Sequence, residues 1–370
     1  MNNKAKHFVS TSQPCVGEDE KRAIGKVLDS GYFGMGPEVQ AFEKELEGFI
    51  GNDVSVVCLN SGTAALQLAC ESIGLGSGDE VLVPSLTFVA SFQAVSATGA
   101  RPVACDVRLS DGLLDIEDAA NKLTDNTRAI MPVFYAGYPG DIKAIYAFAE
   151  ANDLRVIEDA AHAFGSSSDG VLIGSNSDIC CFSFDPIKNI TSGEGGAVVS
   201  RDLDVVKCVR EKRELGIQRG SNDQFEVSAQ GWRCHMSDLM ASIGRVQLAK
   251  FEKELKPLRQ SLQKSYRHYL QGIPEVELLQ TSAEVVPHII PIRLPINKRQ
   301  KVRDALYSAG FDTRIHYMPN HLLEYYNQEL PCLRTERLFQ ELLTLPTHPG
   351  VTIQHVSEIA GIIKLCLKDF

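Results

Sequence analysis

Short runs of apolar, β-branched residues alternate with amphipathic stretches through the first half of the chain. This alternation is typical of βαβ units, in which helices cover both faces of a largely parallel sheet. In open α/β sheets the ligand binds in a crevice beyond the carboxyl ends of the strands. The pattern therefore predicts an α/β fold with a sheet-edge site. The predicted strands are VSVVCL (54–59), EVLVP (80–84), PVACDV (102–107), RAIMPV (128–133) and LRVIED (154–159).

Helices are expected between these strands, from Ser61, near residue 88 and over 140–152. Two further strands, DICCFSF (178–184) and GGAVVS (195–200), follow each other with only a polar, Gly-rich loop between them. Such a hairpin-like pair interrupts the βα rhythm. The loop between its strands is therefore singled out as a candidate functional segment.

The second half of the chain has a different pattern. From Ser237 to about residue 271 the apolar spacing is helical, which predicts one long helix or two. Beyond it we expect a small α+β unit. Its predicted elements are a strand in VPHIIPIRL, a helix near 299–309, a strand around 312–317 and a closing helix near 352–366. We therefore expect a large domain over 1–250, including an N-terminal segment of about 1–20, and a small domain over 251–370.

The composition limits which kinds of partner the protein is expected to bind. The chain has 370 residues, 44% of them hydrophobic, and 37 Lys+Arg against 47 Asp+Glu give a net charge of −10. Without a run of basic residues, nucleic acid and anionic lipid are not expected partners. The sequence has no apolar stretch long enough to span a bilayer, and its N-terminus lacks the apolar core of a signal peptide. These features predict a cytoplasmic protein that does not enter the membrane.

Ten cysteines are scattered along the chain without a paired CxxC arrangement. The adjacent Cys180 and Cys181 fall inside an apolar, strand-like run, where small hydrophobic side chains fit. We interpret the cysteines as reduced thiols and expect neither disulfides nor a metal site.

Two segments at predicted strand ends could bind a ligand. Asn60 to Leu66 (NSGTAAL) opens a helix, so its free amides could hold a phosphate or simply form an ordinary N-cap. Asp159 either caps the helix that follows it or holds a protonated pyridine nitrogen. His162 either flanks the same ring or has a structural role.

Lys188 lies in the loop between the two later strands, just before a glycine cluster. Most lysines are solvated surface groups. A lysine held against a crevice can instead have a lowered pKa, condense with an aldehyde and act as a base. The position between two strands favours this second interpretation.

Five motifs in this order and at this spacing resemble the sugar aminotransferases of the DegT/DnrJ/EryC1/StrS family. The resemblance runs from residues 30–51 to residues 231–248, with a fainter match in TRIHYMPNH (313–321). The motifs are NSGTAALQLA, VLVPSLTFVAS, GARPVACDV, VIEDAAHAFGS and FSFDPIKNITSGEGGAVVS.

The resemblance implies a fold-type I enzyme that depends on pyridoxal phosphate (PLP), with a mostly parallel seven-stranded sheet and a small C-terminal α+β domain. Lys188 would be the Schiff-base lysine and Asp159 the partner of the pyridine nitrogen. Phe88 and His162 would flank the ring, an arrangement that aromatic side chains suit. Gly62, Thr63 and Ser183 would bind the phosphate.

The family also implies a homodimer whose subunits share each active site, with GWRCHMSD (231–238) reaching into the neighbour. This chain departs from the family there, because Arg233 stands where Asn is frequent and His235 where Arg is frequent. Arg233 either makes the phosphate contact across the subunit boundary or that contact is lost. Asp185 replaces the His, Tyr or Asn frequent before the lysine, and is expected near the substrate.

The expected reaction moves an amino group from glutamate to a nucleotide-linked keto-sugar, for the biosynthesis of surface polysaccharides, other glycans or natural-product sugars. A 4-keto-6-deoxyhexose is the first expectation and a 3-keto sugar the second. His316 and Tyr317 either contact this sugar nucleotide or form a packing pair at a strand end.

Three other functions fit the sequence less well. A sugar dehydratase relative would carry His where this chain has Lys188. A regulatory protein could keep the fold and cofactor without transamination. A nicotinamide dehydrogenase would need a GxGxxG after the first strand, and the sequence has none there.

Overall fold

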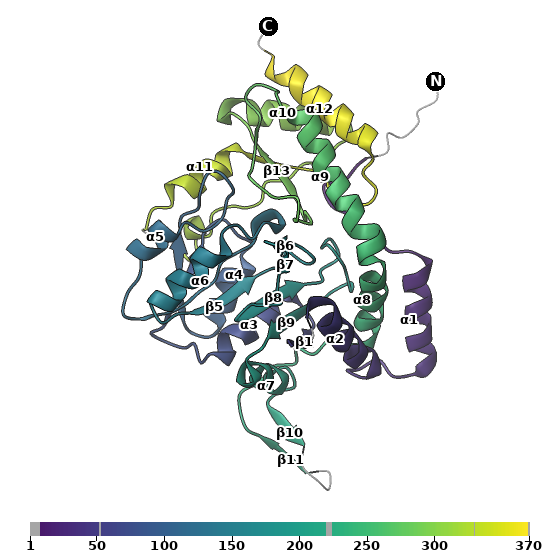
Figure 1. Cartoon of the computed structure of the whole chain (residues 1–370), viewed down its shortest axis with the longest axis vertical. Helices are drawn as coiled ribbons and strands as arrows, with labels where there is room; N and C mark the ends of the chain where they lie inside the picture. The colour runs from purple at the N-terminus through teal and green to yellow at the C-terminus, as the bar shows by residue number, and fades with distance from the viewer. Residues whose placement is uncertain (1–7, 52, 220–223, 329, 369–370) are drawn as a thin grey trace.

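The computed structural model describes residues 8–51, 53–219, 224–328 and 330–368. At its centre is a seven-stranded sheet in the order β1-β9-β8-β5-β4-β2-β3 (Figure 1). All neighbouring pairs are parallel except those of β9, which runs antiparallel to β1 and β8. The predicted fold class is therefore confirmed. The strands are β1 (Ser55–Leu59), β2 (Glu80–Pro84), β3 (Arg101–Cys105), β4 (Thr127–Ile130), β5 (Arg155–Asp159), β8 (Ile179–Ser183) and β9 (Gly196–Ser200).

Helices cover both faces of the sheet, as strands buried on two sides require. Alternate residues of each strand enter separate cores: Val57 and Leu59 face one side, whereas Val56 and Cys58 face the other. The first core is closed by α3 (Gly62–Ser72), α4 (Ala90–Ala97) and α7 (Leu203–Lys212). The opposite face is covered by α2 (Pro37–Ile50), α5 (Ile116–Asn121), α6 (Ile142–Ala151) and α8 (Asp238–Lys250).

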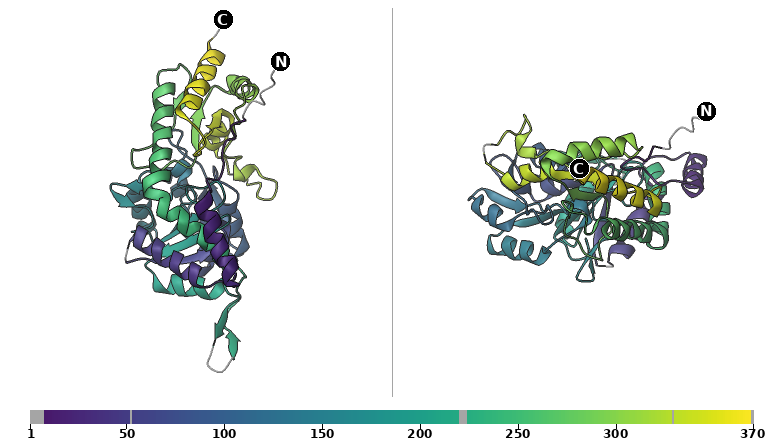
Figure 2. Two further views of the ribbon diagram at one scale, coloured as in Figure 1. Left: turned by 90° about the vertical axis from the view of Figure 1, so that its right-hand side faces the viewer. Right: turned by 90° about the horizontal axis from the view of Figure 1, so that it is seen from above.

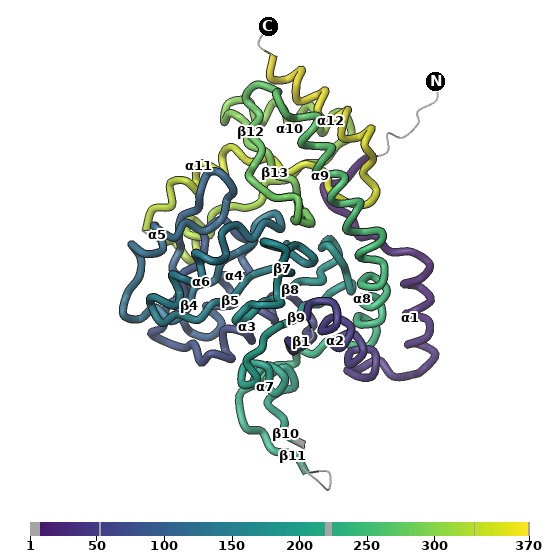
Figure 3. The backbone as a smooth tube through the Cα atoms, in the orientation of Figure 1, coloured from purple at the N-terminus to yellow at the C-terminus, as the bar shows by residue number. Residues whose placement is uncertain are grey.

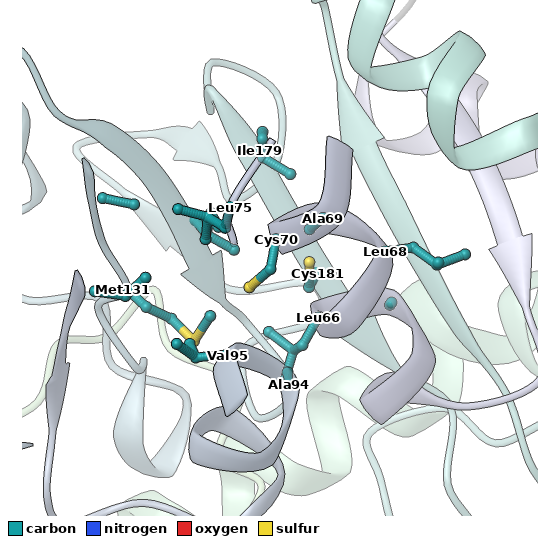
Figure 4. Close-up of a cluster of buried hydrophobic side chains, with 14 of the residues drawn as sticks. Leu66, Leu68, Ala69, Cys70, Leu75, Ala94, Val95, Met131, Ile179 and Cys181 are labelled. Atoms are coloured by element: carbon teal, nitrogen blue, oxygen red, sulfur yellow. The ribbon is translucent and has the colours of Figure 1, made fainter. Parts of the chain in front are cut away.

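The cysteines behave as packing residues. All ten are free thiols in this structure. Figure 4 shows Cys70 and Cys181 within the first core, beside Leu66, Ala69 and Met131. Cys180 points to the opposite face of β8 and belongs to the other core.

A long helix leads away from the sheet. Helix α8 continues through one π-helical turn (Phe251–Leu255) into α9 (Lys256–Leu270), as Figures 1 and 2 show. The sequence left one helix or two open, and the chain forms a single continuous run. The expected domain boundary at residue 250 falls at the π turn and stays a prediction.

The C-terminal elements form a small α+β layer. Its antiparallel sheet has the order β12-β13-β14, and its apolar core also includes residues of the three helices around it. The N-terminal segment joins this layer, because Val9 N donates to Gly310 O at 2.8 Å (Figure 3). The elements are β12 (Glu277–Leu278), β13 (Ile290–Arg293), β14 (Leu342–Leu345), α9, α10 (Ile296–Ser308) and α12 (Ile353–Leu367).

The strand predicted around 312–317 is wrong. Residues 342–345 take the place beside β13, and only Arg314 makes a bridge, to Thr344. The segment instead crosses to the large sheet, where Asn320 Nδ2 donates to Ser85 O at 3.1 Å and Thr87 O at 2.8 Å. The sequence interpretation also assigned no element to α1 (Glu18–Ser30), α2, α11 (Leu333–Glu341), β14, or the projecting hairpin of β10 (Ile217–Arg219) and β11 (Phe225–Val227).

The described part of the chain has neither a membrane-spanning helix nor a metal-binding cluster. No helix there combines the length and apolarity needed to cross a bilayer. The same residues hold no cluster of three or more acidic, histidine or cysteine side chains arranged to bind a metal.

A glycine pair tests the packing behind β5. Gly165 and Gly170 both have positive φ (79° and 77°), but a Cβ on Gly165 would lie 2.1 Å from Phe251 Cζ, whereas a Cβ on Gly170 would meet nothing within 4 Å. We expect Gly165→Ala to lower the free energy of unfolding by roughly 2–4 kcal/mol, since overpacking adds to backbone strain. Gly170→Ala should cost about 1 kcal/mol from strain alone. Urea denaturation measures both, and equal losses would contradict the packing described.

Candidate active site

Polar residues predicted at the carboxyl edge of the sheet lie together there. Asp159 is the last residue of β5 and Ser183 the last residue of β8, and these two strands are paired neighbours. Lys188 lies in the loop that joins β8 to β9. The topology thus brings together three residues that the sequence singled out.

Asp159 is a buried carboxylate with 5% of its surface exposed. Its Oδ2 accepts from Ser91 Oγ at 2.7 Å, and its Oδ1 accepts from the amide of Ala161 at 3.1 Å. Burial raises the pKa of Asp159, while the two hydrogen bonds and the charge of Lys188 oppose that rise. A cationic partner would stabilise the ionised form of this carboxylate further.

Lys188 is a half-buried amine with a lowered pKa. Burial and, as the smallest contribution, the charge of Arg259 lower its pKa to about 8, against the opposing effect of the Asp159 and Asp185 carboxylates. Its Nζ forms no hydrogen bond or ion pair with any residue that the structure describes. A fraction of this amine is therefore neutral, and nucleophilic, at neutral pH.

Uncharged imidazoles lie beside the lysine. His162 Nε2 is 3.0 Å from the hydroxyl of Tyr317, and the ring of His288 is 4.3 Å from that of His162, centroid to centroid. Burial, reinforced by the charge of Lys188, lowers the pKa of both histidines far below the usual value. Nδ1 of each is buried without a hydrogen-bond partner among the described residues. The two rings are thus neutral, and each keeps one nitrogen unused.

The predicted phosphate residues form a tight cradle. Ser61 caps α3 by accepting from Ala64 N at 3.1 Å, so the first amides of the helix point outward without intrahelical acceptors. A Cβ on Gly62 would lie 2.7 Å from that of Ser183, so no other residue allows this approach of helix and strand. The amides at Gly62 and Thr63 together with the Ser183 hydroxyl suit an anion.

Phe88 lies between β2 and α4, with 57% of its surface exposed. Its ring centroid is 5.9 Å from that of Tyr317, which in turn is 6.0 Å from His162. Phe88, Tyr317 and His162 therefore form a row of rings at the site. His316 is directed elsewhere than Tyr317, because its Nδ1 forms a hydrogen bond with Thr344 Oγ1 at 2.9 Å. Burial lowers the pKa of His316 to about 4.

Two predicted residues occupy other positions. Asp185 Oδ1 accepts from the amide of Ile187 at 3.1 Å, which shapes the lysine loop from within. Arg233 is exposed and lines a separate cavity of about 490 Å³ with Tyr32, Glu214 and His235. Among the described residues of one chain, no hydrogen bond or ion pair joins Arg233 to Lys188 or Asp159.

The chemical groups gathered at this site fit one cofactor. An amine poised to react with an aldehyde, a buried carboxylate, an anion cradle and a row of rings match the four chemical features of PLP: its aldehyde, pyridine nitrogen, phosphate and ring face. Together with the sheet topology, they define a fold-type I PLP enzyme.

Comparison with known proteins confirms this class and narrows it. The chain belongs to the DegT/DnrJ/EryC1/StrS aminotransferase family, whose model matches residues 14–364. It is 36% identical over 335 residues to dTDP-3-amino-3,4,6-trideoxy-alpha-D-glucose transaminase of Streptomyces venezuelae, covering 88% of this chain and 86% of that protein.

Solved structures agree with the family assignment. The aminotransferase TlmJ from Streptoalloteichus hindustanus superposes with a TM-score of 0.92 at 32% identity, covering 97% of this chain and 99% of TlmJ. The protein Spr1654 from Streptococcus pneumoniae, solved in a PLP form, gives a TM-score of 0.90 at 27% identity, over 97% and 98% of the two chains. The expectation of a PLP-dependent aminotransferase is confirmed.

Sequence reasoning missed three residues that shape the site. Ser91 follows Phe88 by three positions in the same motif, so its place on the ligand side of the turn was inferable. His288 stands next to an apolar strand and resembles a packing residue in the sequence. Arg259 lies in a charged, amphipathic helix, where an arginine usually faces solvent, and only the tertiary structure shows it buried.

Ser91 offers a test of how Asp159 is held. We expect Ser91→Ala to raise the pKa of Asp159, because it removes a hydrogen bond to the charged form. PLP affinity, measured by absorbance titration of the cofactor-free protein, should fall about 3–10-fold. Ser96→Ala is the matched control, since Ser96 lies on the same helix but donates to Phe92 O at 2.9 Å. Equal effects of the two variants would show that Ser91 contributes only to folding.

Proposed function

We propose that this chain transfers an amino group from glutamate to the keto carbon of a nucleotide-linked hexose, with PLP held by Lys188. The observation that carries the proposal is a free amine with a lowered pKa, placed at the same sheet edge as the buried Asp159 carboxylate, whose charge acts on it. The other members of the site support it by their chemistry.

Each end of the cofactor has a matching group on this chain. Asp159 would hold the pyridine nitrogen. Hydrogen bonds from Ser91 and Ala161 stabilise the ionised form of its carboxylate. The cradle of Gly62, Thr63 and Ser183 would hold the phosphate. When bound, PLP withdraws electrons from the carbon attached to the transferred nitrogen, and this lowers the barrier to proton removal there.

Lys188 also supplies the proton transfer. As a free neutral amine, its Nζ would take a proton from the donor's α-carbon. The same nitrogen could then deliver that proton to the carbon on the other side of the transferred nitrogen, and the reverse sequence would serve the acceptor. A pKa of about 8 suits both duties, because the amine exchanges between its two forms near neutral pH.

The acceptor is a sugar nucleotide by similarity to the relatives. The sequence resemblance placed a 4-keto sugar first, but the 36% identical transaminase is named for a product aminated at C3 of a dTDP-linked sugar. We therefore place a dTDP-linked 3-keto-6-deoxyhexose first and the 4-keto isomer second. Tyr317, which adjoins both Phe88 and His162, is better placed to contact the sugar than His316, whose ring bonds with Thr344.

The proposed active unit is a homodimer. Arg233 is exposed on its own chain and has no part in its own chain's lysine site. Its guanidinium would be available to a phosphate of the neighbouring subunit, and Asp185 is proposed to face the substrate at the lysine loop.

The pH dependence of cofactor capture tests the role of Lys188. Only the neutral amine attacks the aldehyde, so capture of PLP by the cofactor-free protein should rise about tenfold per pH unit and level off near pH 8. Stopped-flow absorbance measures the rate. Lys188→Ala should abolish covalent retention after borohydride reduction, and Lys143→Ala, which removes an exposed lysine paired with Asp169, should not. Retention of reduced cofactor by the Lys188→Ala protein would overturn the assignment.

A substrate panel tests the reaction itself. The holoenzyme is incubated with ¹⁵N-glutamate and with dTDP-, UDP- and GDP-linked keto-hexoses, and mass spectrometry identifies which sugar gains the labelled nitrogen. We expect the strongest gain on a dTDP-linked 3-keto sugar. The Lys188→Ala protein serves as control. Turnover of glutamate without labelling of any nucleotide sugar would place the acceptor outside this class.

A further inference from the structure

Arg259 is a buried cation without an acidic partner. It lies on α9 with 2% of its surface exposed, and no described carboxylate forms an ion pair with it. Two other buried arginines differ, because Arg213 pairs with Glu43 and Arg293 with Glu341. A charge held away from water without a counter-ion is costly, so a compensating interaction is expected.

The guanidinium of Arg259 is directed at the lysine loop. Its Nη2 donates to the carbonyl of Lys188 at 3.0 Å and its Nη1 to the carbonyl of Pro287 at 3.2 Å, while its Nε is buried without a partner among the described residues. The rigid fork thus holds two segments that are distant in the sequence. Pro287 precedes His288, so the same arginine anchors the backbone on both sides of the site.

Asn189 strengthens this connection from the opposite direction. Its Nδ2 donates to Phe164 O at 3.1 Å and to Val286 O at 3.0 Å. Hydrogen bonds of two buried side chains, Arg259 and Asn189, therefore connect residues 188 and 189 to residues 286 and 287. Only the arginine carries a charge.

We infer that Arg259 is a positioning residue for Lys188, which fixes the backbone of the lysine by its fork and favours the neutral amine by its positive charge. The inference rests on the proposed role of Lys188 and deepens it. The Arg259 guanidinium donates to the backbone carbonyls of Lys188 and Pro287, so its effect on the lysine amine is indirect.

The other groups around Lys188 set the background for this effect. Asp159 on β5 and Asp185 on the loop favour the protonated amine, and the buried His162, His288 and His316 are neutral because burial and the lysine charge lower their pKa values. Burial lowers the pKa of Arg259 itself to about 10, so it stays charged at neutral pH. Arg259 is thus the cation that opposes the two carboxylates.

The test measures the lysine in the cofactor-free protein. Acetylation of Lys188 by acetic anhydride is followed by mass spectrometry as a function of pH, in wild type, Arg259→Gln and Arg259→Lys. Gln removes the charge, so the profile should move up by about half a pH unit and labelling at pH 7 should slow about threefold. Lys keeps the charge, so its profile should stay near that of wild type.

Amide hydrogen exchange of the segment 186–190 gives a second readout, which does not need the Gln variant to fold. Arg259→Lys lacks the fork, so exchange there should become faster than in wild type. Arg267→Gln is the matched control: Arg267 lies on the same helix and donates to Leu279 O at 2.8 Å, away from the lysine loop. It should change neither readout.

The outcomes separate this inference from the proposed function. An unmoved labelling profile in Arg259→Gln, equal shifts in Arg259→Gln and Arg267→Gln, or unchanged exchange in Arg259→Lys would overturn the role of Arg259. If borohydride reduction placed PLP on a different residue, the proposed function would fail instead. The labelling profile of Lys188 would still report whether Arg259 acts on it.

Discussion

The partial removal of Lys188 from water is the constraint on which the site depends. Two carboxylates, Asp159 and Asp185, would by themselves hold this lysine protonated and unreactive. Burial outweighs them and brings the pKa to about 8, so the balance is set by desolvation rather than by pairing. The same cause keeps His162 and His288 neutral. Burial disfavours the charged form of each imidazole, and the nearby charge of Lys188 disfavours it further.

The sheet makes this burial possible. Strands β5 and β8 are covered on both faces, and their adjacent carboxyl ends deliver Asp159 and Ser183 to the same edge. Because β9 returns antiparallel to β8, the loop between them begins and ends at that edge, and Lys188 must lie there. The hairpin-like break in the βα rhythm is thus the feature that positions the lysine.

The sequence predicted the parts of this arrangement that depend on local pattern. Runs such as EVLVP and LRVIED are apolar because both faces of the strand are buried, and they identified β2 and β5 to within a residue. Asp159 and Lys188 stand at the ends or between such runs, so they could be found. Arg259 could not, since its burial depends on how α9 packs against a loop some seventy residues earlier. The wrong strand prediction around 312–317 has the same origin. It is β14 that pairs with β13, and the apolar pattern alone does not show which of two segments forms that pair.

The groups that match PLP and the residues proposed to contact the substrate come from different parts of the chain. This difference explains why the reaction type was easier to predict than the substrate. The groups that match PLP come from the strand ends and the first turn of α3, where the backbone geometry leaves few choices. Tyr317 and Asn320 come instead from a segment of the small C-terminal layer that crosses to the large sheet and is held by hydrogen bonds to Ser85 and Thr87. A crossing segment can change its side chains without disturbing the sheet. Under the proposed function, the chemistry of the site is therefore tied to the fold, whereas the choice of acceptor would depend on residues that the fold leaves free to vary.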